Sequence, residues 1–321
     1  MIKAWLLTSP ASKNYWYENL RFLDEMKKRG LDTQHINPDM CTVVNDDVYI
    51  GAEKIIPPDL VIMRHAVWNT IGLKKLEILK KYGTVFVADI DPHIEALDKI
   101  NAHKKYEKAG IPLAKTIFVD LSSESSFDEV DNIIGYPCVV KWRFAAGSEK
   151  VFLCKDEFEL YAIAGNLIKA LPSEQFYKRF SPNPTDIYSK HNTTVVVQEY
   201  LDLDYMIAAH AVRGRNVQAM MQVIPPSFVG YSKFQANFAS HKDRVQLPIK
   251  ACNELKDLID RSLSALNVEW GRIDIFPTKE GFKLCEVNPA GNPTTAEMTS
   301  LQNLVGHMID HAIEIYQSVK R

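Results

Sequence analysis

The sequence lacks any apolar run of about 18 residues, and this absence predicts a protein without a transmembrane helix. It also lacks an excess of charge of either sign, because 38 Lys and Arg residues face 40 Asp and Glu residues. A net charge of −2 gives no electrostatic reason to expect binding to nucleic acid or to an anionic membrane. The apolar stretch within MIKAWLLTSPASK, at the N-terminus, is too short for a signal peptide.

Cysteine is scarce, with five widely spaced residues and no CxxC pair. This pattern is typical of reduced, mostly buried thiols, so we expect a cytoplasmic protein. A chain of 321 residues buries enough surface to fold without disulfide or zinc staples, and its length predicts two or three domains. Apolar residues make up 46% and charged residues 24%, which excludes a disordered, collagen-like or fibrous protein.

Several catalytic motifs are missing as well. The absence of GxSxG, GxxxxGK[ST] and GxGxxG argues against an α/β-hydrolase, a Walker-type NTPase and a simple dinucleotide-binding fold. His307 and His311 are four residues apart on a predicted helix, but they do not form HExxH and no third ligand follows. A solvated helix face is therefore favoured there over a zinc site.

The chain alternates strand and helix patterns over residues 1–98 and mixes them differently afterwards. The first part has expected strands at 3–7, 60–63 and 84–87 and expected helices at 15–28 and 71–82. This alternation predicts an α/β fold with an open, mostly parallel sheet. The later part is expected to be α+β, with helices at 93–109, 156–170, 252–266 and 301–319, strands at 138–141, 151–154, 194–197, 207–212 and 217–223, and a hairpin of 273–276 and 282–287. Residues 172–192 are expected to form a long connection.

The C-terminal hairpin gives the strongest chemical signal. In a hairpin centred on Glu280, Asp274 and Glu286 lie opposite each other, and Asn288 shares their face because strand side chains alternate. Like charges in this position repel, so a neutralising partner is expected, and these oxygen ligands suit Mg²⁺ bridging to nucleotide phosphates. The alternative is an exposed hairpin with solvated acids.

Two weaker signals concern phosphate and adenine. Lys141 ends an apolar strand, and the loop after it contains Gly147 and Ser148, so a cation and backbone N–H groups can face phosphates. A solvated strand end is the alternative. Exposed backbone in Gln198-Glu199-Tyr200-Leu201, at a strand exit, can bond an adenine edge, although any strand end offers the same groups.

Taken in order, these segments resemble the ATP-grasp superfamily, and within it the RimK-like branch of carboxylate–amine ligases. The segments that carry the resemblance are Asp98-Lys99 with Ala109-Gly110-Ile111-Pro112, Val139-Val140-Lys141, Gln198-Glu199-Tyr200-Leu201, Gly271-Arg272-Ile273-Asp274, and Cys285-Glu286-Val287-Asn288. They cover nearly the whole chain. The resemblance implies an ATP-grasp fold of three domains, expected at 1–98, 99–200 and 201–321, with ATP between the second and third.

The resemblance also implies roles for individual residues. Lys99 and Lys141 would neutralise phosphate oxygens, with Gly147 and Ser148 in the lid over the phosphates. Residues 198–201 (Gln198, Glu199, Tyr200 and Leu201) would hold adenine, and Asp204 would face the ribose. Asp274, Glu286 and Asn288 would hold Mg²⁺ or Mn²⁺. A substrate carboxylate would attack the γ-phosphate, and an amine would then displace phosphate from the acyl-phosphate.

The chain departs from the family at several points. Lys233-Phe234-Gln235-Ala236-Asn237 keeps Asn237, but Gln235 replaces the family's Arg, so Lys233 or Arg272 is expected to contact the transferred phosphate. The loop after Lys141 is poor in glycine. Pro289-Ala290-Gly291-Asn292-Pro293 stands where close relatives have SSPG, which leaves the acceptor open.

Together these patterns predict an ATP- and Mg²⁺-dependent ligase that forms an amide on an amino acid or peptide. A peptide-modifying macrocyclase and a non-catalytic ATP-binding regulatory protein remain as alternatives, and a homo-oligomer remains possible. Nucleic acid and membrane are not expected as partners.

Overall fold

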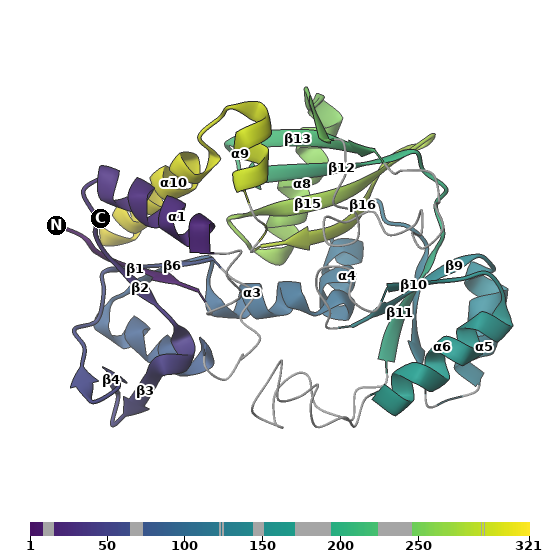
Figure 1. The fold of residues 1–321 in the computed structure, drawn as a ribbon, viewed down its shortest axis with the longest axis horizontal. Helices are drawn as coiled ribbons and strands as arrows, with labels where there is room; N and C mark the ends of the chain where they lie inside the picture. Colours follow the sequence, from purple (N-terminus) through teal and green to yellow (C-terminus); the bar gives the residue numbers. More distant parts are fainter. Residues whose placement is uncertain are drawn as a thin grey trace.

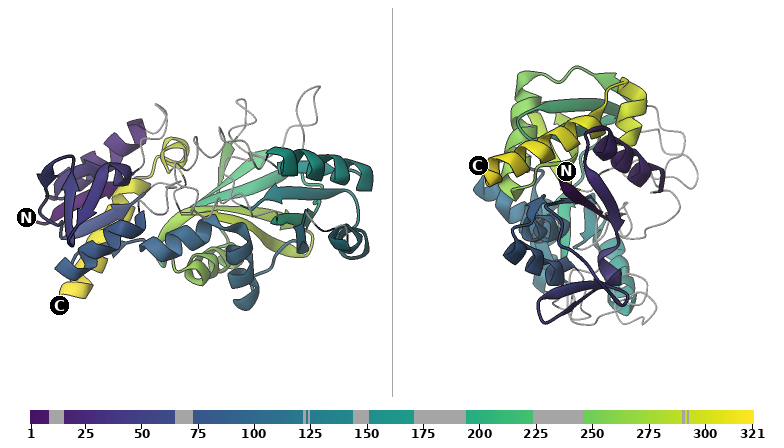
Figure 2. Two further views of the ribbon diagram at one scale, coloured as in Figure 1. Left: turned by 90° about the horizontal axis from the view of Figure 1, so that it is seen from below. Right: turned by 90° about the vertical axis from the view of Figure 1, so that its left-hand side faces the viewer.

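The computed structural model describes residues 1–8, 16–64, 73–121, 123, 125–143, 151–170, 194–223, 246–289, 291 and 293–321. Within these ranges the strands form four sheets, and helices cover their faces (Figure 1). The N- and C-termini lie at the same end of the molecule (Figure 2). None of the described helices combines the length and apolar character needed to cross a membrane.

The N-terminal part contains the predicted parallel sheet. Its strands are β1 (Lys3–Leu7), β2 (Asp32–Ile36), β6 (Leu60–Met63) and β7 (Val85–Val87), in the order β2-β1-β6-β7. All three pairings are parallel, which confirms the prediction from alternating strands and helices. Helix α1 (Trp16–Lys28) agrees with the helix predicted over 15–28. Of the helix predicted over 71–82, the structure describes residues 73–82, and most of these form a 3₁₀ helix, η3 (Lys75–Tyr82).

The sequence patterns missed a small antiparallel sheet in this region. Strands β3 (Cys41–Val44), β4 (Asp47–Ile50) and β5 (Glu53–Lys54) follow one another after a short 3₁₀ helix, η2 (Pro38–Met40). These strands are only two to four residues long, so they offer little period-two pattern to recognise.

One long helix had been expected over 93–109, and this was wrong. The structure has α3 (Ile90–Leu97) and α4 (Lys99–Lys108), separated by Asp98. Asp98 has an extended backbone (φ −90°, ψ 103°), and its carboxylate accepts from the N–H groups of Ile100 and Asn101. An aspartate that caps a new helix stabilises this break, because it satisfies donors that would otherwise have no partner.

The central part is an antiparallel sheet with helices on one side. Its strands are β8 (Thr116–Asp120), β9 (Cys138–Trp142), β10 (Val151–Cys154) and β11 (Thr194–Glu199), in the order β10-β9-β11-β8. Helices α5 (Ser125–Glu129), continued by a π-helical turn η4 (Val130–Ile134), and α6 (Glu157–Ala170) cover one face (Figure 1). The predicted connection at 172–192 lies outside the described residues.

The C-terminal part is a five-stranded antiparallel sheet in the order β14-β13-β12-β15-β16. The strands are β12 (Tyr205–Val212), β13 (Asn216–Val223), β14 (Gln246–Ile249), β15 (Trp270–Thr278) and β16 (Gly281–Asn288). One face packs on α8 (Asn253–Leu266), whose buried Leu255 and Ile259 join Ile273 and Leu284 in a common core. The other face therefore carries the polar residues of the sheet.

The last predicted helix, over 301–319, is present, and a short helix that was not predicted precedes it. The structure has α9 (Thr294–Ser300) and α10 (Leu304–Lys320), and Leu301 between them adopts a left-handed φ of 58°. Asn303 caps α10 by accepting from the N–H of Gly306. Since a left-handed residue ends one helix and a capping residue begins the next, the apolar period alone could not locate this boundary.

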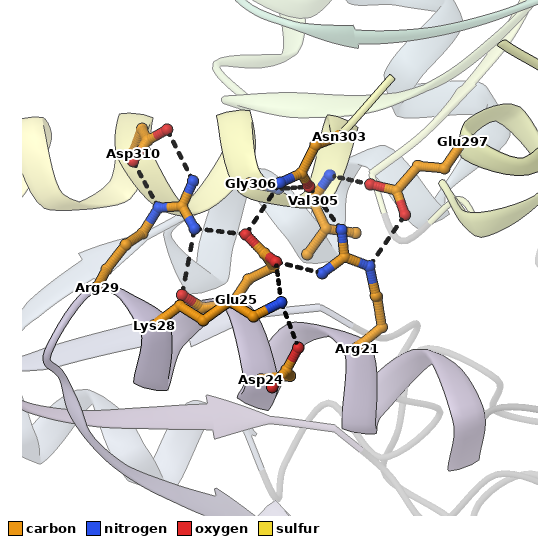
Figure 3. A network of polar contacts seen from close by, with 10 residues as sticks. All are labelled: Arg21, Asp24, Glu25, Lys28, Arg29, Glu297, Asn303, Val305, Gly306 and Asp310. Atoms are coloured by element: carbon orange, nitrogen blue, oxygen red, sulfur yellow. Dashed lines mark hydrogen bonds and ion pairs between the residues drawn. The ribbon is translucent and has the colours of Figure 1, made fainter. Parts of the chain in front are cut away.

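Helix α10 packs on the N-terminal sheet rather than on its own sheet alone. Its Val305 and Ile309 share a core with Leu6 of β1 and Phe22 of α1. Glu25 of α1 is 3% exposed and accepts from Arg21, Lys28, Arg29 and Asn303 (Figure 3). The two ends of the chain are thus joined by apolar and charged contacts. The division at residues 98 and 200 stays a prediction.

Candidate active site

The predicted pair of acidic residues meets on the C-terminal hairpin. Asp274 of β15 lies opposite Glu286 of β16, as the sequence predicted. This pairing depends on an irregularity in the hairpin. From the turn outward, the strands pair in one register from Thr278–Gly281 to Ile275–Leu284, and the register then shifts by one residue between Ile275 and Asp274. Without this β-bulge, Asp274 would lie opposite Cys285. The bulge therefore brings the two carboxylates together.

The polar face of the sheet is organised in rows across the strands. One row contains Gln218, His210, Arg272 and Asn288, and the next contains Met220, Ala208, Asp274 and Glu286. The amide nitrogen of Asn288 donates to Oε1 of Glu286 at 3.0 Å, so all three predicted metal ligands are neighbours. This donor set of two carboxylates and one amide fits Mg²⁺, which prefers hard oxygen ligands.

Lys141 of β9 extends from the central sheet toward this face. Its ammonium donates to Oε1 of Gln198 at 2.8 Å and lies 3.7 Å from Sγ of Cys285. Gln198 in turn donates to the hydroxyl of Thr116 at 3.1 Å. The predicted phosphate lysine and the first predicted adenine residue are therefore in direct contact, at the junction of the central and C-terminal sheets.

Lys99 is the second cation of the site. Burial lowers its pKa, and its surroundings include both the Glu286 carboxylate and the Lys141 ammonium. Burial opposes ionisation of Glu286, but Lys99 and Lys141, with the hydrogen bond from Asn288 and the charge of Arg272, hold the pKa of Glu286 below its usual range. The repulsion predicted between Asp274 and Glu286 is thus offset by lysines from another part of the chain.

Asp98 holds this lysine in place, a role that the sequence reasoning missed. Its carboxylate caps α4, of which Lys99 is the first residue, and accepts two bonds from Arg143, from Nε at 2.7 Å and from Nη2 at 2.6 Å. The N–H of Lys99 donates to the carbonyl of Arg143 at 3.2 Å. A capping aspartate before a break in helical periodicity was the available signal.

The segment after β11 connects the two sheets. Glu199 accepts from the N–H of Lys115 at 2.7 Å and pairs with Lys283 at 3.2 Å. Tyr200 donates to Asp202 at 3.3 Å, and Leu201 and Asp204 lie in the same connection. Beside it, Met206 forms a small apolar cluster with Leu203, Phe276 and Cys285. The connection itself is half-buried or exposed over residues 199–204, so it forms an accessible edge beside this apolar cluster.

Four predicted site residues lie outside the described residues, namely Gly147, Ser148, Lys233 and Asn237. The remaining predicted residues lie at or beside the junction of the central and C-terminal sheets. The zinc alternative gains no support, because His311 bonds Glu269 at 2.7 Å. Within the described ranges, no three His, Cys, Asp or Glu side chains are arranged to hold a metal ion. A metal at Asp274 and Glu286 would thus depend on Asn288 and on oxygens of a bound substrate.

His210 is a buried neighbour of Arg272 that the sequence analysis did not single out. It lies directly opposite Arg272 on β12 and is 4% exposed. Burial, assisted by the positive charge of Arg272, lowers the pKa of His210 to about 3. The imidazole is therefore neutral at physiological pH.

This neutral histidine predicts a pH dependence of stability. Because the unfolded chain binds a proton below a pH of about 6.5 and the folded chain does not, His210 destabilises the fold progressively as the pH falls from there toward 3. The slope approaches about 1.4 kcal/mol per pH unit. Urea unfolding at pH 7.5 and 5.5 measures this effect. Between these pH values, His210→Gln should lose less free energy of unfolding than the wild type. An equal loss in both proteins would contradict the assignment.

Comparisons with known proteins concern the whole chain rather than single site residues. A model of the RimK-like ATP-grasp domain matches residues 96–312, more than half of the chain. Among curated proteins, a probable alpha-L-glutamate ligase of Xylella fastidiosa (strain M12) is 23% identical over 314 residues, with 94% of this chain and 93% of the relative covered.

Solved structures show the same fold. The ATP-grasp ligase PsnB in complex with a minimal precursor has a TM-score of 0.66 at 12% identity, covering 98% of this chain and 100% of that chain. The D-alanine–D-alanine ligase of Bacillus anthracis in complex with ATP has a TM-score of 0.66 at 14% identity, covering 99% and 98%. The predicted ATP-grasp fold is therefore confirmed.

Proposed function

Because the chain belongs to the RimK-like ATP-grasp family, we propose that it is an ATP-dependent carboxylate–amine ligase. The observation that carries this proposal is the meeting of two lysines and two carboxylates at one junction. Lys99 and Lys141 come from the central part, and Asp274 and Glu286 come from the C-terminal hairpin. Phosphoryl transfer depends mainly on such charge stabilisation and positioning.

In this proposal the chain's residues divide the work of the reaction. Lys99 and Lys141 neutralise phosphate oxygens of ATP, and the segment from Gln198 to Leu201 holds adenine, with Asp204 on the ribose side. Asp274, Glu286 and Asn288 hold Mg²⁺, which supplies further charge neutralisation at the phosphates when bound. The Lys141 ammonium has three N–H donors, so it can bond phosphate oxygens while it keeps its bond to Gln198.

The bonds change in two steps. A carboxylate oxygen of the first substrate attacks the γ-phosphorus of ATP, and ADP leaves with the electron pair of the broken P–O bond. The nitrogen of an amine then attacks the acyl carbon, and the bond from this carbon to the phosphate oxygen breaks. Phosphate leaves with that electron pair, and the proton lost by the nitrogen passes to phosphate as the amide forms. Arg272, with Lys233 and Asn237, is proposed to contact the transferred phosphoryl group. An amino acid or short peptide is the proposed substrate class.

A peptide-modifying ligase is the second candidate. PsnB, described in complex with a minimal precursor, matches 98% of this chain at a TM-score of 0.66. The two candidates differ in the amine or hydroxyl acceptor and share the activation of a carboxylate by ATP. Release of ADP with free amino acids favours the first candidate, whereas release only with a longer peptide favours the second.

The test begins with nucleotide binding. ATP with Mg²⁺ should raise the thermal midpoint, because a ligand that binds only the folded state stabilises it, by about 2.7 kcal/mol at one hundred times its Kd. Lys141→Ala should lose most of this shift. The matched control is Lys155→Ala, at an exposed lysine just after β10, and it should keep the shift. ADP release would then be screened with L-glutamate, other amino acids and short peptides.

Two outcomes would count against the proposal. A wild-type protein whose midpoint does not move with millimolar nucleotide does not bind ATP as proposed. Binding without ADP release across the amino acid and peptide panel would instead favour a non-catalytic ATP-binding protein.

A further inference from the structure

The guanidinium group of Arg272 is held by two side chains from different strands. Its Nε donates to Oδ1 of Asp274 at 2.9 Å, and its Nη2 donates to Oε1 of Gln222 at 3.3 Å. We infer that Gln222 is a positioning residue that holds Arg272 in place for phosphoryl transfer. This inference rests on the proposed function, in which Arg272 contacts the transferred phosphoryl group.

The contact spans three strands of the C-terminal sheet. Arg272 belongs to β15 and Gln222 to β13, and β12 lies between them. On the intervening strand, Ala208 pairs with Asp274 on one side and Met220 on the other. The small side chain of Ala208 leaves the polar face open at this point, so two long side chains can meet across β12. A direct side-chain contact over this separation fixes the direction in which Arg272 extends.

The chemistry of the two partners differs in a useful way. Asp274 is a proposed Mg²⁺ ligand, so its oxygens would be shared between the metal and the guanidinium when the metal binds. Gln222 is 1% exposed and offers an uncharged amide oxygen, which holds Arg272 without cancelling its positive charge. A neutral holder therefore preserves the charge that stabilises a phosphoryl group in transfer.

The same strand supplies a matched control. Gln218 is also buried, at 4% exposure, and it lies four residues before Gln222 on β13, so both side chains share one face. Its amide bonds Gln302 at 2.8 Å and Ser300 at 2.7 Å. Replacing either glutamine removes a buried amide from the same strand. Of these two glutamines, only Gln222 bonds Arg272 in the described part of the chain.

The experiment compares Gln222→Met with Gln218→Met, using ADP release with the amino acid that gives the fastest wild-type turnover. Gln222→Met should lower kcat about tenfold or more, because small misplacements of a reacting group cost up to a hundredfold. Its KM for ATP and its nucleotide-induced thermal shift should stay within about twofold of wild type. Gln218→Met should keep its kcat within about twofold. If the methionine variant folds poorly, Gln222→Asn serves in its place. The asparagine side chain is one methylene shorter, so its amide does not reach Arg272, and kcat should fall in the same way.

A double-mutant cycle separates positioning from a structural effect. If Gln222 acts through Arg272, Gln222→Met should lower kcat little further in an Arg272→Ala background, whereas independent effects would multiply. Three results would overturn this inference and leave the proposed function standing. They are independent effects in the cycle, an unchanged kcat in both Gln222 variants, and equal losses of kcat in the two methionine variants. A wild-type protein without ADP release would overturn the proposed function, and this inference with it.

Discussion

Glu286→Gln should reduce turnover by about a hundredfold or more, the scale expected when a stabiliser of transferring charge is lost. The substitution keeps the shape of the side chain and removes one of the two carboxylates proposed to hold Mg²⁺. It also removes the acid that faces Lys99 and Lys141, so the nucleotide-free protein should lose a little stability, about 1 kcal/mol. Steady-state ADP release and the Mg²⁺ dependence of turnover measure the first effect, and urea unfolding measures the second.

The control for this variant is Glu280→Gln, in the exposed turn of the same hairpin. It removes the same charge from the turn that joins these strands. Its turnover should match that of the wild type, and its free energy of unfolding should change by less than about 0.5 kcal/mol. Full turnover in Glu286→Gln would show that the hairpin acids are a solvated surface pair. The proposed metal site would then have to be abandoned.

Glu25→Ala should cause the largest loss of stability, about 3 kcal/mol, because it removes a buried carboxylate that accepts several charged hydrogen bonds. Of their ion pairs, Arg21 would keep only the one with Glu297, and Arg29 only the one with Asp310. Oε1 and Oε2 of Glu25 lie 2.5 Å from Arg21 and Arg29 respectively, and Asn303 donates to Oε2 at 3.0 Å (Figure 3). The bond from Asn303 joins α1 to the start of α10, and the bonds from the two arginines fix the Glu25 carboxylate in place. The thermal midpoint should fall by about 5 °C or more.

The neighbouring Asp24 provides the control for Glu25. It pairs with Lys28 at 2.8 Å, but both side chains are more than half exposed. Asp24→Ala should therefore change stability by no more than about 0.5 kcal/mol. Comparable losses in the two variants would mean that burial of Glu25 adds nothing to the strength of its ion pairs.

The network at Glu25 also predicts a dependence on pH. Burial raises the pKa of Glu25, but the bonds from Asn303, Arg21 and Arg29 outweigh it and hold the pKa well below its usual range. A carboxyl group with a lowered pKa contributes stability above the pKa of the unfolded chain, near 4.5, and this stability is lost as the pH falls below that value. The difference between wild type and Glu25→Ala should accordingly shrink below pH 4.5.

The sequence by itself determined the features that depend on local periodicity. Alternation of strands and helices over residues 1–98 predicted the parallel sheet, and period-two spacing predicted that Asp274 and Glu286 share a face. The first prediction succeeded because the alternation of elements is a local property of the chain. The second also needed the β-bulge between Asp274 and Ile275, which period-two spacing does not predict. The same reasoning failed at Asp98, where one predicted helix is two, and it missed the short helix α9, whose C-cap is Leu301. Apolar spacing continues across such a boundary, so the break depends on the conformation of a single residue.

Only the tertiary structure decided which charges meet. Lys141 and Glu286 are far apart in the chain, and they interact because the central sheet lies beside the polar face of the C-terminal sheet. The bond from Arg272 to Gln222 crosses an intervening strand, and no spacing along the sequence encodes a sheet order of β13-β12-β15. Local periodicity sets the direction of a side chain within its own strand. The partner it meets is set by the packing of distant segments, which is where the electrostatic environment of this site is made.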